Sequence, residues 1–221
     1  VEQNIVLRHA SDKDLPQIHQ RLSAIGLGNA GADTIVDITS CPGTDTCKLG
    51  IASSRGLAGE LGKQLEAKRA TLPAAIEDLK IKISGCFNSC GQHHVADIGF
   101  FGNSRRSGNH KVPHFQVVLG GQWQNNGGSY GLAMGAVPAK LVPDVLDVIT
   151  NTYVEERDEN EIFQAWVERK GKRAMKDLIQ PFMKLPTIEE QPKFFSDWGD
   201  SRIYSIADIG IGISKENIKS P

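Results

Sequence analysis

The chain has 221 residues, a formal net charge of −1 at pH 7 and 39% hydrophobic residues. This length supports a substantial core in one compact domain or two, and the balanced charge excludes the basic composition of general nucleic-acid or membrane-surface binding. No apolar run approaches the roughly 18 residues of a membrane span, and the chain does not open with the apolar stretch of a signal peptide. We therefore expect a soluble, cytoplasmic protein without a nucleic-acid or membrane partner.

The first part of the chain predicts a strand, a helix and a second strand. Residues 3–9 are typical of a strand, and Ser11 is a suitable N-cap for a following helix. Residues 34–39 predict a strand that leads into Cys41. The apolar residues of the helix recur at helical spacing, which indicates packing against the core, at Leu15, Ile18, Leu22 and Ile25.

The middle of the chain predicts a helix from about Ser53 to Ala70, then an alternating, half-buried strand over 79–83 that leads into Cys86. Residues 95–101 and 115–119 are typical of the two arms of a hairpin with a long tip over 102–114.

The last third predicts two packing helices, the first from about Pro138 or Pro143 to Glu156 and the second over about 161–182 with a possible break at Gly171. The tail is aromatic, from Phe194 to Gly199, and the sequence assigns no chemistry to it. The predicted fold class is α/β in the broad sense (α+β), a mixed sheet with packed helices.

All four cysteines lie in two short segments, 41–47 and 86–90, with C-x5-C and C-x3-C spacing and 38 residues between them. Four thiolates on two loops are the ligand set of a 4Fe–4S cluster. Because both segments follow predicted strands, a sheet would hold them in register. A structural zinc site is the main alternative, but its cysteine pairs are usually closer in sequence. Disulfides suit small secreted scaffolds better than this chain.

The residues around these cysteines carry a family resemblance. The segment from Thr39 to Ala58, which contains CPGTDTC, and the segment from Ser84 to Phe100, which contains CFNSC, resemble the two cluster motifs of the sulfite/nitrite reductase haemoproteins. The resemblance implies one half of a two-fold repeated architecture, with a 4Fe–4S cluster coupled to a sirohaem. It also implies that the Cys90 thiolate ligates both centres, while the cluster ligands are Cys41, Cys47, Cys86 and Cys90.

Three further residues are candidates for cofactor binding. Asn88 lies between Cys86 and Cys90 and could donate to a cluster sulfide, or it could simply supply left-handed turn geometry. Lys48 and Arg55 follow the first loop, where cations would stabilise an anionic cluster and the sirohaem carboxylates; alternatively both are ordinary solvated side chains.

The resemblance implies six-electron reduction of a small inorganic oxyanion, sulfite to sulfide or nitrite to ammonia. The electron donor would be ferredoxin or an NADPH flavoprotein. Two alternatives stay open: a 4Fe–4S electron-transfer module without sirohaem, inactive as a reductase on its own, and a structural or zinc-binding domain.

The expected division is a remnant of a ferredoxin-like half-domain over 1–30, a sirohaem and cluster domain over 31–157, and a helical extension over 158–221. Because Val1 opens directly into a strand-like run, we expect a partial chain whose N-terminal half would be a partner. No catalytic residue is assigned.

Overall fold

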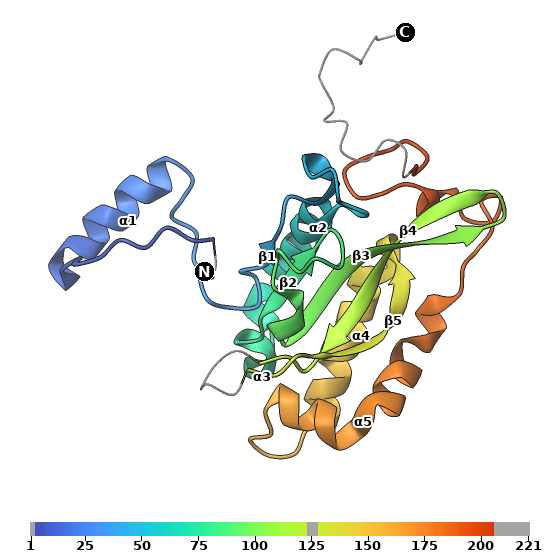
Figure 1. Cartoon of the computed structure of the whole chain (residues 1–221). Coiled ribbons are helices and arrows are strands. Elements are labelled where there is room, and N and C mark those ends of the chain that lie inside the picture. Colours follow the sequence, from blue (N-terminus) through green and yellow to red (C-terminus); the bar gives the residue numbers. More distant parts are fainter. Residues whose placement is uncertain (1–2, 123–127, 206–221) are drawn as a thin grey trace, which may run out of the picture.

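The computed structural model describes residues 3–122 and 128–205. Its centre is a five-stranded sheet in the order β1-β2-β3-β4-β5. Strands β1, β2 and β3 are parallel, whereas β4 is antiparallel to both β3 and β5 (Figure 1). The strands are Thr39–Ser40, Ile81–Ser84, Ile98–Ser107, His110–Leu119 and Leu132–Pro138. The predicted mixed sheet is therefore confirmed.

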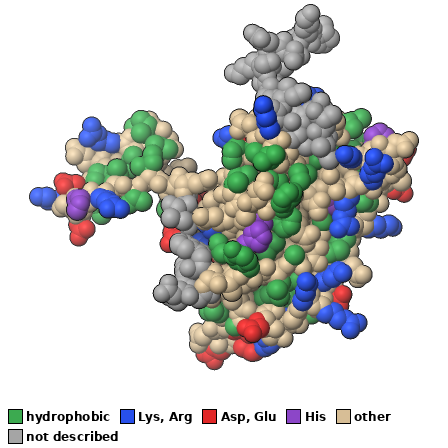
Figure 2. Space-filling view, viewed as in Figure 1, with side chains coloured by type: hydrophobic (Ala, Val, Ile, Leu, Met, Phe, Trp, Pro, Cys, Tyr) green, Lys and Arg blue, Asp and Glu red, His purple; other side chains and the backbone are tan. Residues whose placement is uncertain are grey.

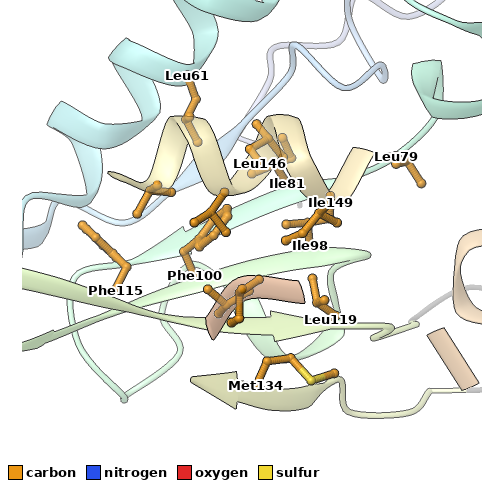
Figure 3. Packing of buried hydrophobic residues seen from close by; sticks show 14 of the residues in the cluster. Leu61, Leu79, Ile81, Ile98, Phe100, Phe115, Leu119, Met134, Leu146 and Ile149 are labelled. Carbon is orange, nitrogen blue, oxygen red and sulfur yellow. The ribbon is translucent and has the colours of Figure 1, made fainter. Parts of the chain in front are cut away.

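Three helices pack on one face of the sheet: α2 (Ser54–Lys68), α4 (Val142–Glu156) and α5 (Phe163–Ile179). Apolar side chains from α2 and α4 meet those of β2, β3 and β4 in one core, part of which is shown in Figure 3. The predicted break in the last helix is confirmed, because Gly171 has φ 76° and ψ 159° inside α5. None of the described helices is long and apolar enough to cross a membrane.

Strand β2 is buried on both faces, not half-buried as predicted. Ile81 and Ile83 point into the core, yet Lys82 on the opposite face is only 1% exposed. That face is covered by the connection from β2 to β3, whose 3₁₀ helix His93–Val95 lies against β3 at Gly99. The alternation of apolar and polar residues over 79–83 could not show that the connection from β2 to β3 covers the polar face.

The predicted long hairpin tip is wrong. Strands β3 and β4 run through almost all of 102–114, and Ser107 pairs with His110 across a two-residue turn. Gly108 takes φ +58°, the positive value that tight hairpin turns require. The polar residues of the expected tip are therefore strand residues.

The amino-terminal segment also differs from the prediction. Residues 3–9 form no strand; Gln3 and Asn4 reach Ser40 and Asp37 only through side-chain hydrogen bonds. The expected helix is present as α1 (Leu15–Ala24), but it buries none of its residues. Figure 1 shows α1 standing away from the sheet, and Figure 2 shows hydrophobic side chains on the surface of this arm. The predicted core packing of its apolar stripe is therefore wrong.

Residues 34–39 form less strand than predicted, because only Thr39–Ser40 pair with β2. Ile35 is nevertheless buried, and its N–H donates to the Glu77 carbonyl at the end of α3 (Ala74–Glu77). The apolar residues of this segment thus pack as an irregular chain.

His114 predicts a pH dependence of stability. Its Nδ1–H donates to the Val112 carbonyl, and burial lowers its pKa from 6.5 to about 4. In the unfolded chain His114 is protonated below about pH 6.5, whereas in the folded chain it stays neutral down to about pH 4. The stability of the fold therefore decreases as the pH falls through this range. The free energy of unfolding, measured in urea, should fall by about 2 kcal/mol more in wild type than in His114→Asn when the pH is lowered from 7 to 5. Equal losses would contradict this role.

Candidate metal centre

The two cysteine segments lie side by side at one edge of the sheet. Cys41 follows β1, and Cys86 follows β2 after Gly85. Because β1 and β2 are parallel neighbours, their carboxyl ends meet at the same edge. The Cys41 N–H donates to the Ile83 carbonyl at 3.1 Å. The sheet therefore positions both cysteine loops, as the sequence predicted.

The two loops touch through their backbones. The Gly85 N–H donates to the Cys41 sulfur at 3.1 Å. A Cβ on Gly85 would lie 2.5 Å from the Gly43 Cα and 2.9 Å from the Ala52 carbonyl oxygen, so only glycine fits there. Gly43 itself takes φ +58°.

The segment between the first loop and α2 joins the two loops. The N–H groups of Ile51 and Ala52 both donate to the Gly85 carbonyl, at 2.7 and 3.0 Å. The Ser54 hydroxyl donates to the Cys41 carbonyl at 2.7 Å and lies 3.4 Å from the Cys41 sulfur. We call residues 51–54 the bridging segment.

The second loop is closed at its base by two buried side chains. The Ser84 hydroxyl accepts from the Gly91 N–H at 3.0 Å and lies 2.8 Å from His93 Nδ1. Burial, with a smaller contribution from His94, lowers the pKa of His93 to about 4, so the ring is neutral at pH 7. The sequence analysis missed the contact between Ser84 and His93, because no local pattern shows that these two residues face each other.

The four cysteines are free thiols with different exposure. Cys41 and Cys86 are buried, Cys47 is intermediate and Cys90 is exposed. In the part of the chain that the structure describes, no three Cys, His, Asp or Glu side chains are gathered as around a metal ion. The convergence of the four sulfurs therefore stays a prediction. The donor set nevertheless fits a 4Fe–4S cluster, because four free thiols sit on two touching loops.

The other predicted site residues lie on the surface. Lys48 and Asn88 are exposed, and Arg55 forms an exposed ion pair with Asp45 at 3.7 Å. Such a pair contributes little to stability. The left-handed residues of the second loop are Ser89 and Gln92, so the turn geometry considered for Asn88 is not found there. The cofactor roles of Lys48, Arg55 and Asn88 stay predictions.

Comparison with known proteins agrees with this geometry. A family model described as the nitrite and sulphite reductase 4Fe-4S domain matches residues 31–185. The solved structure of the Mycobacterium tuberculosis NirA protein is similar with a TM-score of 0.61 and 28% identity, over 74% of this chain and 31% of that one.

Curated relatives match the same part of the chain. Sulfite reductase [ferredoxin] 1 of Mycolicibacterium paratuberculosis is 31% identical over 170 residues, 76% of this chain and 31% of the relative. The ferredoxin–nitrite reductase of Synechococcus elongatus is 32% identical over 146 residues, 66% of this chain and 28% of the relative. This chain thus spans about a third of the length of these relatives. The family match covers more than half of the chain, which therefore belongs to the nitrite and sulphite reductase 4Fe-4S domain family.

Proposed function

We propose that the chain carries the 4Fe–4S cluster of a sulfite or nitrite reductase and that its four cysteines are the cluster ligands. The observation that carries the proposal is the contact between the two cysteine loops, in which Gly85 N–H donates to the Cys41 sulfur. The family membership supports the cluster type. Each of the two loops contributes one buried thiol, Cys41 from the first and Cys86 from the second.

Sirohaem is the second cofactor of the proposal, and it would supply the iron at which the oxyanion is reduced. Cys90 is the exposed cysteine, so its thiolate can meet a group bound outside the domain. Phe87 and Tyr130 are also exposed, by 66% and 76%, and the His94 ring lies 5.3 Å from the Tyr130 ring. Figure 2 shows histidine and hydrophobic side chains together on the exposed face of the main body. Rings of this kind suit a planar macrocycle.

The proposed reaction is six-electron reduction of sulfite or nitrite, with electrons entering through the cluster. The names of the relatives, which include ferredoxin-dependent enzymes of both kinds, favour ferredoxin over an NADPH flavoprotein as donor. Four free thiols suit a reducing compartment such as the cytoplasm.

The proposed organisation keeps the expected boundaries. Of the expected segment 1–30, the described residues 3–30 include helix α1, which buries none of its residues. The cluster domain covers 31–157, and the extension of 158–221 begins at the turn between α4 and α5, two helices that share one core.

The visible spectrum tests the proposal. The chain would be reconstituted anaerobically with iron and sulfide, with and without sirohaem. We expect the broad brown absorption of a cluster in both samples, and strong red absorption retained after gel filtration only in the second. A cluster without retained sirohaem would favour the electron-transfer module, and a chain that takes up zinc but no iron–sulfur cluster would contradict the proposal.

A further inference from the structure

The chain beyond the family match returns to the cysteine loops. Residues 194–204, which we call the strap, follow the region that the family model covers. Phe194 and Phe195 anchor its start in a small apolar cluster with Val112. The Tyr204 N–H donates to the Phe195 carbonyl at 2.7 Å, which closes the strap on itself. Figure 1 shows the strap at the end of the molecule where the loop before α2 lies.

Asp197 joins the strap to the bridging segment. One carboxylate oxygen accepts from the Ser53 N–H at 2.8 Å, and the other accepts from the Trp198 N–H at 2.8 Å. The side chain is buried, with the residue only 6% exposed. A buried carboxylate whose two oxygens both accept hydrogen bonds is held in one orientation. Burying the same carboxylate without these bonds would lower the stability of the fold. Asp197 therefore fixes Ser53 from across 144 residues of chain.

Two aromatic residues complete the attachment. The Tyr204 hydroxyl donates to the Ile51 carbonyl at 2.6 Å. The Trp198 indole N–H donates to the Ala139 carbonyl at 2.8 Å, and the Lys140 ammonium lies 4.1 Å from the ring centroid. The strap thus connects the bridging segment to the start of α4.

The bridging segment is therefore held from two sides. Its Ile51 and Ala52 N–H groups bind the Gly85 carbonyl, next to Cys86. Its Ile51 carbonyl and Ser53 N–H bind the strap. We infer that the strap is a positioning element for the metal centre: it fixes the bridging segment, which keeps the second cysteine loop in contact with the first. This inference rests on the proposed function only in naming the cluster as the group whose ligands are positioned.

Tyr204→Phe tests the inference, because it removes the bond to the Ile51 carbonyl and keeps the ring. Ser107→Ala is the matched control: its hydroxyl donates to the Pro186 carbonyl at 2.9 Å, so it ties the same tail to β3 away from the bridging segment. Asp197→Asn is a second variant, since an amide can accept only one of the two N–H groups that the carboxylate accepts.

Two measurements would be made on the whole 221-residue chain. Without cluster, hydrogen exchange at the amides of Ile51 and Ala52 should be about fivefold faster in Tyr204→Phe, the factor that one net hydrogen bond supplies. After reconstitution, the cluster absorbance should decay about fivefold faster in air for the same variant. Ser107→Ala should match wild type in both, even where its melting temperature falls.

Three results would overturn the inference. Tyr204→Phe and Asp197→Asn could both match wild type, Ser107→Ala could accelerate exchange and decay equally, or exchange could rise while cluster decay stays unchanged. A wild-type chain that binds no cluster would contradict the proposed function instead, and the exchange measurement would still decide whether the strap holds the bridging segment.

Discussion

Each of the four cysteine-to-serine substitutions should lower the cluster content of the reconstituted chain, with bound iron falling clearly below the value of about four per chain expected for wild type. Serine is a harder and more basic ligand than a thiolate, and the cubane needs a thiolate at each iron. The structure predicts a graded loss. Cys41 and Cys86 are buried and their loops are in contact, so replacing either one also disturbs the packing around the site. Cys90 is exposed, so replacing it should disturb the packing less.

Iron and sulfide analysis after anaerobic reconstitution would measure this loss, and Thr44→Ser is the control because it alters the first loop without removing a thiol. A cysteine variant with full iron content and an unchanged spectrum would remove that residue from the ligand set. In the sirohaem-containing protein, Cys90→Ser should alter the haem spectrum directly, since its thiolate would be shared. Equal haem changes in Cys41→Ser and Cys90→Ser, with the cluster present in both, would argue against sharing.

The sequence predicted most of the strands and helices that carry the cysteine loops better than it predicted the contacts between distant segments. The strand-like pattern before each cysteine pair predicted that both pairs lie on loops that follow strands of one sheet. The structure adds that these two strands are parallel neighbours, so the two loops lie at the same edge. Helices α2, α4 and α5 were also predicted nearly at their observed bounds, because their apolar stripes face one core. These features depend on local pattern.

The features that were missed depend on partners distant in sequence. The apolar run at Ile5, Val6 and Leu7 is as strand-like as any, yet these residues are 56–88% exposed because no strand pairs with them in the described structure. The same limit applies to the strap: nothing near Asp197 or Tyr204 in sequence indicates that they bind residues 144 and 153 positions earlier.

Gly85→Ala should be among the most damaging small substitutions in the chain. Its new methyl group would lie 2.5 Å from the Gly43 Cα and 2.9 Å from the Ala52 carbonyl oxygen, and both are backbone atoms that cannot rotate away. Overpacking of this kind costs about 3 kcal/mol, so the urea midpoint should fall clearly. The methyl group would also separate the two cysteine loops, so cluster uptake should be lost with the stability.

Gly59→Ala is the matched control, because it makes the same chemical change in the exposed part of α2, where a Cβ would meet nothing within 4 Å. There alanine should raise the free energy of unfolding by roughly 0.5–1 kcal/mol through its helix propensity. Opposite signs for the two variants would show that the contact at Gly85, and not the loss of glycine flexibility, causes the damage. A Gly85→Ala chain with wild-type stability would mean that the two cysteine loops do not touch, and the proposed metal centre would lose its geometric basis.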